Sequence, residues 1–526
     1  MTRSSLLQRL LSSLKKHSSL IVIANFLVII ILTWMPFNFA VPLDLSWAAT
    51  IDQFRGTPDT SNSTDVIVNV LFFIPLGIGG GAWLTEHWQR FRSIQVLAIT
   101  LLVSFGLSLT VETGQLFLIS REPGLIDLAT NSFGGFLGVG FYLLVERFQK
   151  PLVYFFDRLT LFRQPQLLFR ALITFWLAYL GLMSGLLISV ADSNQLTNWR
   201  ADLPLIVGNE NTGDRPWTGT IHNLCISDQA LETSYIRQAI GKHPCPKLEQ
   251  TTEFSSSYAF APLTQNYPDL ADNSPSLQSL NITVSDKREG VTLGSHNMLR
   301  STESPLVLNR RIRDSSQFTL ITDIATDNFQ QEGPARIISL SQDLHHRNLT
   351  LAQSRPDLSL RLRMPFTGDN GKQPEIRLNN FFRDTDFHPL AVVYDGLELH
   401  FISYGLDKTL YLGSEAALFW STFGIISEKM FLIVNVDWFN KILYYSFIFV
   451  PLGISFGLIC HLLKTNSIVS LGILLTSGLL VPPLLIEGII NSTSDRIFTW
   501  QYPVLGFTVL SVSFWLTKFA RSRITS

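Results

Sequence analysis

Eight long apolar stretches constrain this chain more than any other feature of its sequence. Each is long enough to cross a hydrocarbon core about 30 Å thick, because an α-helix rises about 1.5 Å per residue. Only 15% of the residues are charged, and the mean hydropathy is +0.25. The stretches are residues 20–37, 66–84, 94–118, 125–145, 167–190, 441–463, 466–490 and 498–518. They predict a polytopic α-helical membrane protein.

The positively charged residues between these stretches predict how the chain is oriented, because Lys and Arg concentrate in cytoplasmic loops. One side carries Arg90, Arg92, Arg147, Lys150, Arg158, Arg163, Arg170, Lys464, Lys518, Arg521 and Arg523, together with the N-terminus. The other side carries only Arg55, Arg121 and Arg496. We therefore expect both termini to be cytoplasmic and residues 191–435 to be exoplasmic. The first stretch lacks a clear cleavage site, so we expect it to be a retained anchor.

Two parts of the chain, 375 residues apart, carry the same polar marks inside apolar stretches. The first part has Pro-Leu-Gly at 75–77, then Glu112 and Arg121, and the second has Pro-Leu-Gly at 451–453, then Glu487 and Arg496. A carboxylate inside a membrane helix costs about 2.5–3.5 kcal/mol or more, so two at the same spacing are not a coincidence. The pattern predicts two four-helix repeats. Residues 1–150 hold helices one to four. The second repeat combines helix five, which follows a cytoplasmic linker within 151–190, with helices six to eight in 437–526.

Residues 191–415, between helices five and six, are polar and have the alternation of β-strands. Alternation is clear at 318–324 and 358–363, and Asp395-Gly396 is typical of a hairpin turn. Residues 416–436 are too short to span and are expected to form an interfacial or re-entrant helix. The pattern of many short strands predicts an inserted all-β sandwich or jelly roll.

The strands of this region resemble those of the laminin-G/concanavalin-like lectin fold. The matching segments are 318–320, 335–341, 348–353 and 393–396, whereas 204–210 and 216–224 are similar to closing strands of that fold. Because the closing strands here come first, before 258–260, we predict a circularly permuted domain. The resemblance implies a lectin-like domain that contacts a glycan, an envelope polymer or another partner.

The sequence gives little sign of catalytic or metal chemistry in this domain. Asp384 and Asp386 share a strand face, but they suit a solvated turn better than a glycosidase pair. Adjacent histidines, His345 and His346, point to opposite faces of a strand and are poorly placed to share a metal. We therefore expect no metal and no cofactor, and a binding or structural module rather than an enzyme. A net charge of −1 gives no reason to expect a nucleic-acid partner.

Residues 28–145 resemble the VanZ-like family, named for a teicoplanin-resistance protein. The matching residues are Asp65, Asn69, the segment 73–77, Glu112, Gln115, Arg121, Asp127, Asn131, Gly134 and Gly138, and the segment 34–37 resembles the end of that family's first span. The second copy keeps Pro-Leu-Gly, Glu487 and Arg496 but has Gln501 and Gly506 where the first has Asp127 and Asn131, so it is degenerate. The resemblance implies an envelope-associated membrane protein in contact with lipid, without a settled activity.

The polar residues of the first copy are predicted to cluster beneath the exoplasmic face. The cluster comprises Asn69, Glu112, Gln115, Arg121, Asp127 and Asn131, and its catalytic role is unknown. Arg121 is expected to pair with Glu112 or Asp127, because an unpaired buried carboxylate must otherwise be hydrogen-bonded or protonated. The glycines on the stripe 134–138 allow another helix to approach closely.

Three functions are consistent with this sequence. The first is a non-enzymatic envelope protein with a lectin-like domain. The second is a membrane enzyme or carrier for a lipid-linked envelope precursor, with Arg121 binding a phosphate or carboxylate and Glu112 or Asp127 moving a proton. The third is a transporter built on the repeat. A structural interpretation of the cluster, in which Arg121 bridges a carboxylate and Asn69 pairs with Asn131, remains open.

Cys225 and Cys245 are expected to form a disulfide bond, because they are the two exoplasmic cysteines.

Overall fold

The computed structural model describes residues 11, 12, 14–34, 39, 63–88, 90–118, 124–149, 151, 165–240, 255–261, 264–280, 290–295, 297–331, 333–343, 345–423, 431–463, 468–494, 496 and 498–525. The chain divides into two compact units. The first comprises residues 1–181, 449–481 and 507–526, and the second comprises 182–448 and 482–506.

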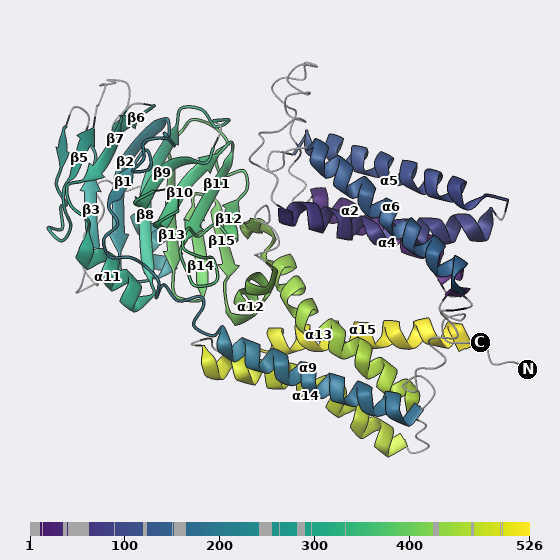
Figure 1. The fold of residues 1–526 in the computed structure, drawn as a ribbon. Helices are drawn as coiled ribbons and strands as arrows, with labels where there is room; N and C mark the ends of the chain where they lie inside the picture. The colour runs from purple at the N-terminus through teal and green to yellow at the C-terminus, as the bar shows by residue number, and fades with distance from the viewer. Residues whose placement is uncertain are drawn as a thin grey trace, which may run out of the picture. The chain divides into compact units, whose positions relative to one another are not determined.

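Four helices in the first unit correspond to the first predicted repeat: α2 (Ser18–Trp34), α4 (Ser63–His87), α5 (Ser93–Gln115) and α6 (Leu125–Arg147) (Figure 1). The side chain of Gln95 accepts a hydrogen bond from the Arg92 amide at 2.8 Å and so satisfies a free donor at the start of α5. The apolar core between α2, α4 and α5 contains Ile29, Phe73 and Val111.

Glycines bring α4 and α6 into backbone contact. A Cβ atom built on Gly134 would lie 2.2 Å from the carbonyl oxygen of Val70, and one on Gly138 would lie 2.2 Å from that of Ile74. From the opposite helix, a Cβ on Gly77 would lie 2.2 Å from the carbonyl oxygen of Gly135. The predicted close approach along the glycine stripe is therefore confirmed, and the partner helix is α4.

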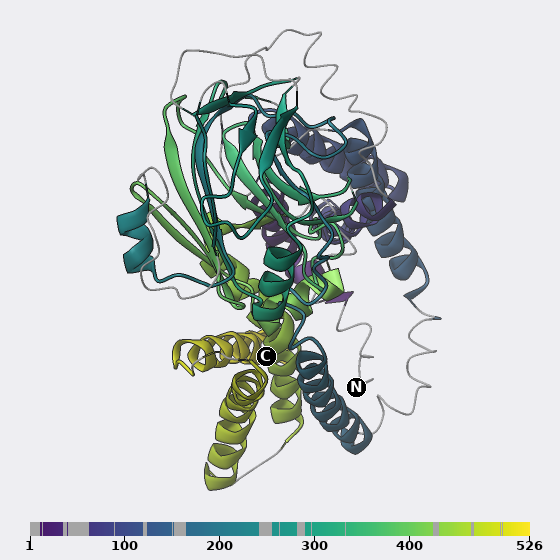
Figure 2. The same ribbon diagram turned by 90° about the vertical axis from the view of Figure 1, so that its left-hand side faces the viewer.

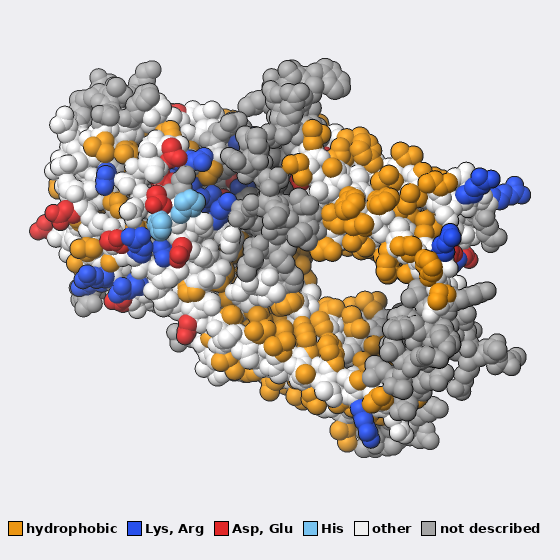
Figure 3. All heavy atoms as spheres, in the orientation of Figure 1, with side chains coloured by type: hydrophobic (Ala, Val, Ile, Leu, Met, Phe, Trp, Pro, Cys, Tyr) orange, Lys and Arg blue, Asp and Glu red, His pale blue; other side chains and the backbone are white. Residues whose placement is uncertain are grey.

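Four further helices follow: α9 (Pro165–Ser189), α13 (Asp437–Leu462), α14 (Ile468–Thr493) and α15 (Gln501–Thr525). Among the described residues, five helical segments are long and apolar enough to cross a membrane: 93–115, 125–147, 165–189, 434–462 and 472–493. Hydrophobic side chains cover much of the visible surface of the helices, whereas charged ones gather over the β-rich domain (Figure 3). The chain is thus a membrane protein with a large β-rich insertion, while the count of eight spans stays a prediction.

The inserted domain is built from two sheets (Figure 2). The nine-stranded sheet has the order β16-β12-β11-β10-β9-β1-β7-β5-β4, and the seven-stranded sheet has the order β15-β14-β13-β8-β2-β3, with β6 paired to β2. The strands are β1 (Leu205–Val207), β2 (Gly219–Ser227), β3 (Ser255–Ala259), β4 (Asn266–Tyr267), β5 (Leu277–Leu280), β6 (Val291–Leu293), β7 (Met298–Ser301), β8 (Phe318–Thr326), β9 (Ala335–Ser341), β10 (Arg347–Ser354), β11 (Asp357–Leu362), β12 (Glu375–Leu378), β13 (His388–Tyr394), β14 (Glu398–Ser403), β15 (Leu406–Tyr411) and β16 (Phe431–Ile433).

Side chains from both sheets meet in the core. The indole of Trp217, just before β2, donates to Gln353 on β10 at 2.8 Å, and the Tyr394 hydroxyl on β13 lies 3.6 Å from the sulfur of Met364. The helix α10 (Thr233–Ala239) covers the other face of the seven-stranded sheet, where Ile236 packs in one cluster with Ile321. Burial on both faces explains why every residue of β8 is buried despite its alternating sequence.

The strands predicted at 318–324 and 358–363 and the hairpin at Asp395-Gly396 are confirmed as β8, β11 and β13–β14. Gly396 has φ +95°, a conformation that suits glycine. The two leading strands of the domain are interior strands, with β1 between β9 and β7 and β2 between β8 and β3. This arrangement agrees with a permuted sandwich, although the permutation itself stays a prediction.

Residues 416–436 differ from the single interfacial or re-entrant helix expected from the sequence. The helix α12 (Ser414–Phe423) ends early, and residues 431–433 form β16, which pairs in parallel with β12. β16 adds a short last strand to the nine-stranded sheet, beyond β12. The sandwich therefore takes its last strand from a segment that the sequence assigned to the membrane surface.

Candidate functional site

Glu112 is the buried carboxylate of the first copy and lies near the end of α5. Its side chain is 1% exposed, and its Oε2 accepts a hydrogen bond from the backbone amide of Gly124 at 2.8 Å. Gly124 is the residue from which α6 begins, and a helix N-terminus carries partial positive charge. The amide and the helix dipole together stabilise a negative charge on Glu112.

Asp127, in the first turn of α6, lies beside the same glycine. A Cβ on Gly124 would be 3.4 Å from Asp127 Oδ2, so the two carboxylates flank one backbone position. Asn69 on α4 donates to Asp127 Oδ1 at 2.9 Å. Three helices thus bring Asn69, Glu112 and Asp127 to the start of α6.

Two other predicted site residues are buried beside these groups. Asn131 donates to the hydroxyl of Ser108 at 3.0 Å, and Gln115 is 8% exposed on α5. The pairing of Asn69 with Asn131, which belonged to the structural interpretation of the cluster, is wrong, because Asn69 bonds to Asp127 one helical turn earlier. Arg121 lies outside the described residues, so its pairing with Glu112 or Asp127 stays a prediction.

Cys225 on β2 is disulfide-bonded, and Cys460 is free. Cys245, its predicted partner, lies outside the described residues, so the assignment of this pair stays a prediction.

Helix packing in the second copy follows the register of the first. A Cβ on Gly77 would meet Gly135, Gly138 and Val139, and a Cβ on Gly453 would meet Leu510, Ser513 and Phe514. Each member of the second set lies 375 residues after its counterpart, which is also the offset from Glu112 to Glu487 and from Arg121 to Arg496. Thus α13 packs on α15 as α4 packs on α6.

This register changes one assignment made from the sequence. Tyr502, rather than Gln501, occupies the position of Asp127, and Gly506 remains at the position of Asn131. The Pro-Leu-Gly offset of 376 places Tyr445 at the position of Asn69. The rings of Tyr445 and Tyr502 are stacked at 6.3 Å, so an aromatic pair replaces the polar Asn69–Asp127 pair.

The second copy contains a buried ion-pair cluster centred on Arg496. Arg496 forms an ion pair with Glu487, nine residues before it. Its Nη1 also lies 2.9 Å from Oε1 of Glu415, on α12, and 2.8 Å from the hydroxyl of Tyr411, on β15. The guanidinium carbon lies 4.1 Å from the centroid of the Tyr502 ring. The side chains of Glu415 and Glu487 are almost fully buried, so both carboxylates depend on this one arginine.

Glu415 is the residue that sequence reasoning missed. It opens a short apolar helix directly after β15, and a lone acid in that context resembles an ordinary first-turn residue. The one sequence feature that could have indicated a buried site residue is its isolation as an acid within an apolar segment. Tyr411 and Tyr445, which both donate to its carboxylate, at 2.8 and 2.9 Å, gave no separate signal.

These features define a membrane protein whose helical bundle has a polar site at one end and whose β-sandwich is inserted between two membrane-length helices. Residues 11–146 match the model of the VanZ/LLP1 family, so this region of the chain is VanZ-like, as the motifs predicted. No curated protein and no solved structure matches the chain.

Proposed function

We propose that this chain is a multi-pass protein of the cell envelope whose β-sandwich binds a glycan, an envelope polymer or a protein partner outside the membrane. The observation that carries the proposal is the way the sandwich is inserted. Membrane-length helix α9 ends at Ser189 shortly before β1, and β16 ends at Ile433 just before α13 begins at Asp437. A domain held at both ends by membrane helices is suited to present a binding surface beside the bilayer.

The proposed orientation has both termini in the cytoplasm and residues 191–435 outside. In intact cells, a membrane-impermeant maleimide is expected to label Leu270→Cys and to leave Arg158→Cys unlabelled. Leu270 is 57% exposed on the sandwich, so its accessibility depends only on the side of the membrane. The unsubstituted protein is the blank, because it gives the labelling of Cys225, Cys245 and Cys460 themselves. The reverse labelling pattern would overturn the orientation.

A second function, headgroup chemistry on a lipid-linked envelope precursor, is favoured by the difference between the copies. The first copy keeps Asn69 and Asp127 where the second has two tyrosines, and only the second receives the extra carboxylate of Glu415. In this proposal Arg121 binds a phosphate or carboxylate, and Glu112 or Asp127 moves a proton. A transporter gains less support, because α4 and α13 continue unbroken through Pro75 and Pro451.

Glu112→Gln tests this second function. The amide keeps the shape of the side chain and can still accept from the Gly124 amide, so we expect loss of the envelope phenotype with nearly normal yield and thermal stability. The control is Glu86→Gln on α4, which removes an exposed carboxylate. A Glu112→Gln protein with full activity would rule out the site, whereas a stability loss that tracks activity would make the cluster structural.

A further inference from the structure

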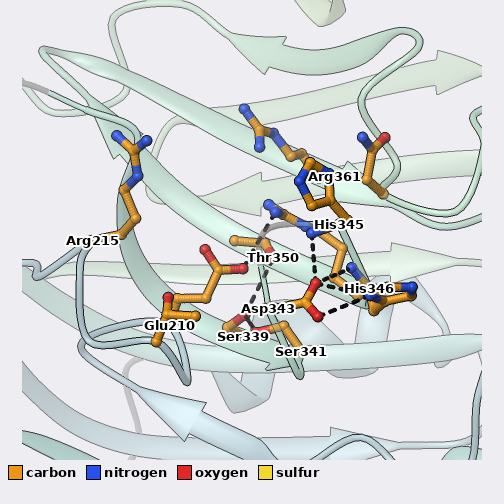
Figure 4. Close-up of polar contacts among 12 residues, drawn as sticks. Glu210, Arg215, Ser339, Ser341, Asp343, His345, His346, Thr350 and Arg361 are labelled. Atoms are coloured by element: carbon orange, nitrogen blue, oxygen red, sulfur yellow. Dashed lines mark hydrogen bonds and ion pairs between the residues drawn. The ribbon is translucent and has the colours of Figure 1, made fainter.

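The outer face of the nine-stranded sheet carries a row of buried polar residues. Strand register aligns Ser339 on β9 with Thr350 on β10 and Thr350 with Arg361 on β11, and the next pairing aligns Ser359 with Arg377 on β12. Leucines at the alternate positions face the core between the sheets. Hydroxyl and guanidinium groups therefore project from one face of four neighbouring strands. Figure 4 shows Ser339, Thr350 and Arg361, which belong to three of them.

The loop at 208–216 lies along this face. It leaves β1 where the Gly208 amide donates to Ile337 and returns where the Arg215 carbonyl accepts from Arg336. Between these points, Asn211 donates to the carbonyl of Gln342, beyond the opposite end of β9, at 3.0 Å. The loop thus extends along β9 and back.

Glu210 projects from this loop between two buried arginines. Its Oε2 lies 3.4 Å from Nε of Arg336, and its Oε1 lies 3.3 Å from Nη2 of Arg347. All three side chains are at most 1% exposed. A second buried carboxylate, Glu375, pairs with Arg361 at 2.7 Å and with Arg377 at 3.4 Å.

The buried row contains more positive than negative charge. Four arginines, at 336, 347, 361 and 377, accompany three buried carboxylates, which are Glu210, Glu375 and, on the same face of β11, Asp357. Burial, together with the charges of Arg361 and Arg347, lowers the pKa of Arg336 to about 9. Nη1 of Arg336 is buried without a hydrogen-bond partner. A buried donor left unsatisfied costs about 1–3 kcal/mol, and more when it is charged, so the row is suited to accept another anion.

We propose that this face binds the acidic groups of an anionic envelope polysaccharide, with Arg336, Arg347 and Arg361 as the recognition residues. The proposal rests on the proposed function of the sandwich and names its ligand class. Arginine suits it because the planar guanidinium pairs with carboxylate or sulfate oxygens in two-point contacts. Glu210 occupies the place of a ligand carboxylate in the structure. Arg215 and His346 at the rim are about half-exposed, beside Asp214 and Asp343, whereas Arg336 and Arg347 are buried, so the ligand reaches them only when the loop at 208–216 moves aside.

The test uses the full-length protein in detergent, with polygalacturonate as the carboxylate probe, dextran sulfate as the sulfate probe and dextran as the neutral probe. We expect binding of the acidic probes that weakens with salt, about tenfold weaker binding for Arg336→Gln and Arg361→Gln, and about tenfold tighter binding for Glu210→Gln. The matched control is Arg237→Gln on α10, an exposed arginine over the seven-stranded sheet, whose loss should leave binding unchanged. Glu210→Gln also keeps the test decisive if an arginine variant fails to fold.

Three outcomes would overturn the proposal in distinguishable ways. Binding of dextran that the arginine and Glu210 variants leave unchanged would remove the anion site but keep glycan binding by the sandwich. If none of the soluble polymers binds, both the anion site and glycan binding by the sandwich would be excluded. Capture by phosphatidylglycerol vesicles alone, lost in Arg336→Gln, would assign the site to lipid headgroups and also overturn the polysaccharide proposal.

Discussion

Replacing Arg496 by glutamine is expected to destabilise the protein by about 3–5 kcal/mol, because it leaves buried carboxylates without their cation. Glu415 and Glu487 are both almost fully buried, and each pairs with this guanidinium. The neutral amide of glutamine cannot compensate two negative charges away from water. The measurement is the thermal or denaturant-induced unfolding of the full-length protein in detergent.

The matched control is Arg237→Gln, which also breaks an arginine–carboxylate pair, with Asp407. That pair is exposed, so its loss should cost at most about 1 kcal/mol. Adding Glu415→Gln to Arg496→Gln should restore part of the lost stability, because one buried charge is then removed. An Arg496→Gln protein as stable as Arg237→Gln would contradict the cluster.

Gly138→Ala is expected to separate α4 from α6 and to lower the stability of the first bundle by about 1–3 kcal/mol or more. The new Cβ would lie 2.2 Å from the carbonyl oxygen of Ile74 and 3.0 Å from Cα of Gly77. Backbone atoms of a packed helix cannot rotate away as a flexible side chain does, so the helices must shift. The loss should appear as a lower thermal midpoint and a lower yield of folded protein.

Gly140→Ala, two residues further along α6, is the control. A Cβ at that position meets no atom within 4 Å, so this change should be neutral or stabilise the helix by up to about 1 kcal/mol. Equal effects of the two substitutions would show that helix propensity, rather than close packing, sets the stability of α6.

Features determined by local pattern could be predicted from the sequence. The apolar lengths predicted the helices, the alternation predicted β8 and β11, and the glycine spacing predicted a close helix contact. The nine-residue interval identified Glu487 and Arg496 as the counterparts of Glu112 and Arg121, and the structure joins them in an ion pair. In each case the interacting groups lie in one element or in elements of the same helical repeat or sheet.

Features that depend on distant segments could not be predicted in the same way. Nothing local indicates that Glu415 reaches Arg496, because their contact requires the whole sandwich to return α12 to the ends of the helices. Helical spacing placed Asn69 and Asn131 among polar neighbours, but the choice of Asp127 as the partner of Asn69 depends on how α4 and α6 align. The β16 pairing likewise depends on an open edge that only the folded sheet presents.

The interior position of β1 has a consequence for the order of folding. Residues 205–207 pair on one side with 338–340 and on the other with 299–300, so the wide sheet remains in two parts until all three segments have been synthesised. Pairings over such sequence distances close slowly, because a long loop loses entropy before the contact forms. The leading strand therefore stays unpaired until Leu299 of β7, 92 residues after Val207, has been added, and one of its edges stays open until Ile338 of β9, 131 residues after Val207. During that interval, the preceding helix α9 anchors the unfinished chain. We expect chaperones on the side of the membrane where the sandwich folds to bind β1 before its partner strands do.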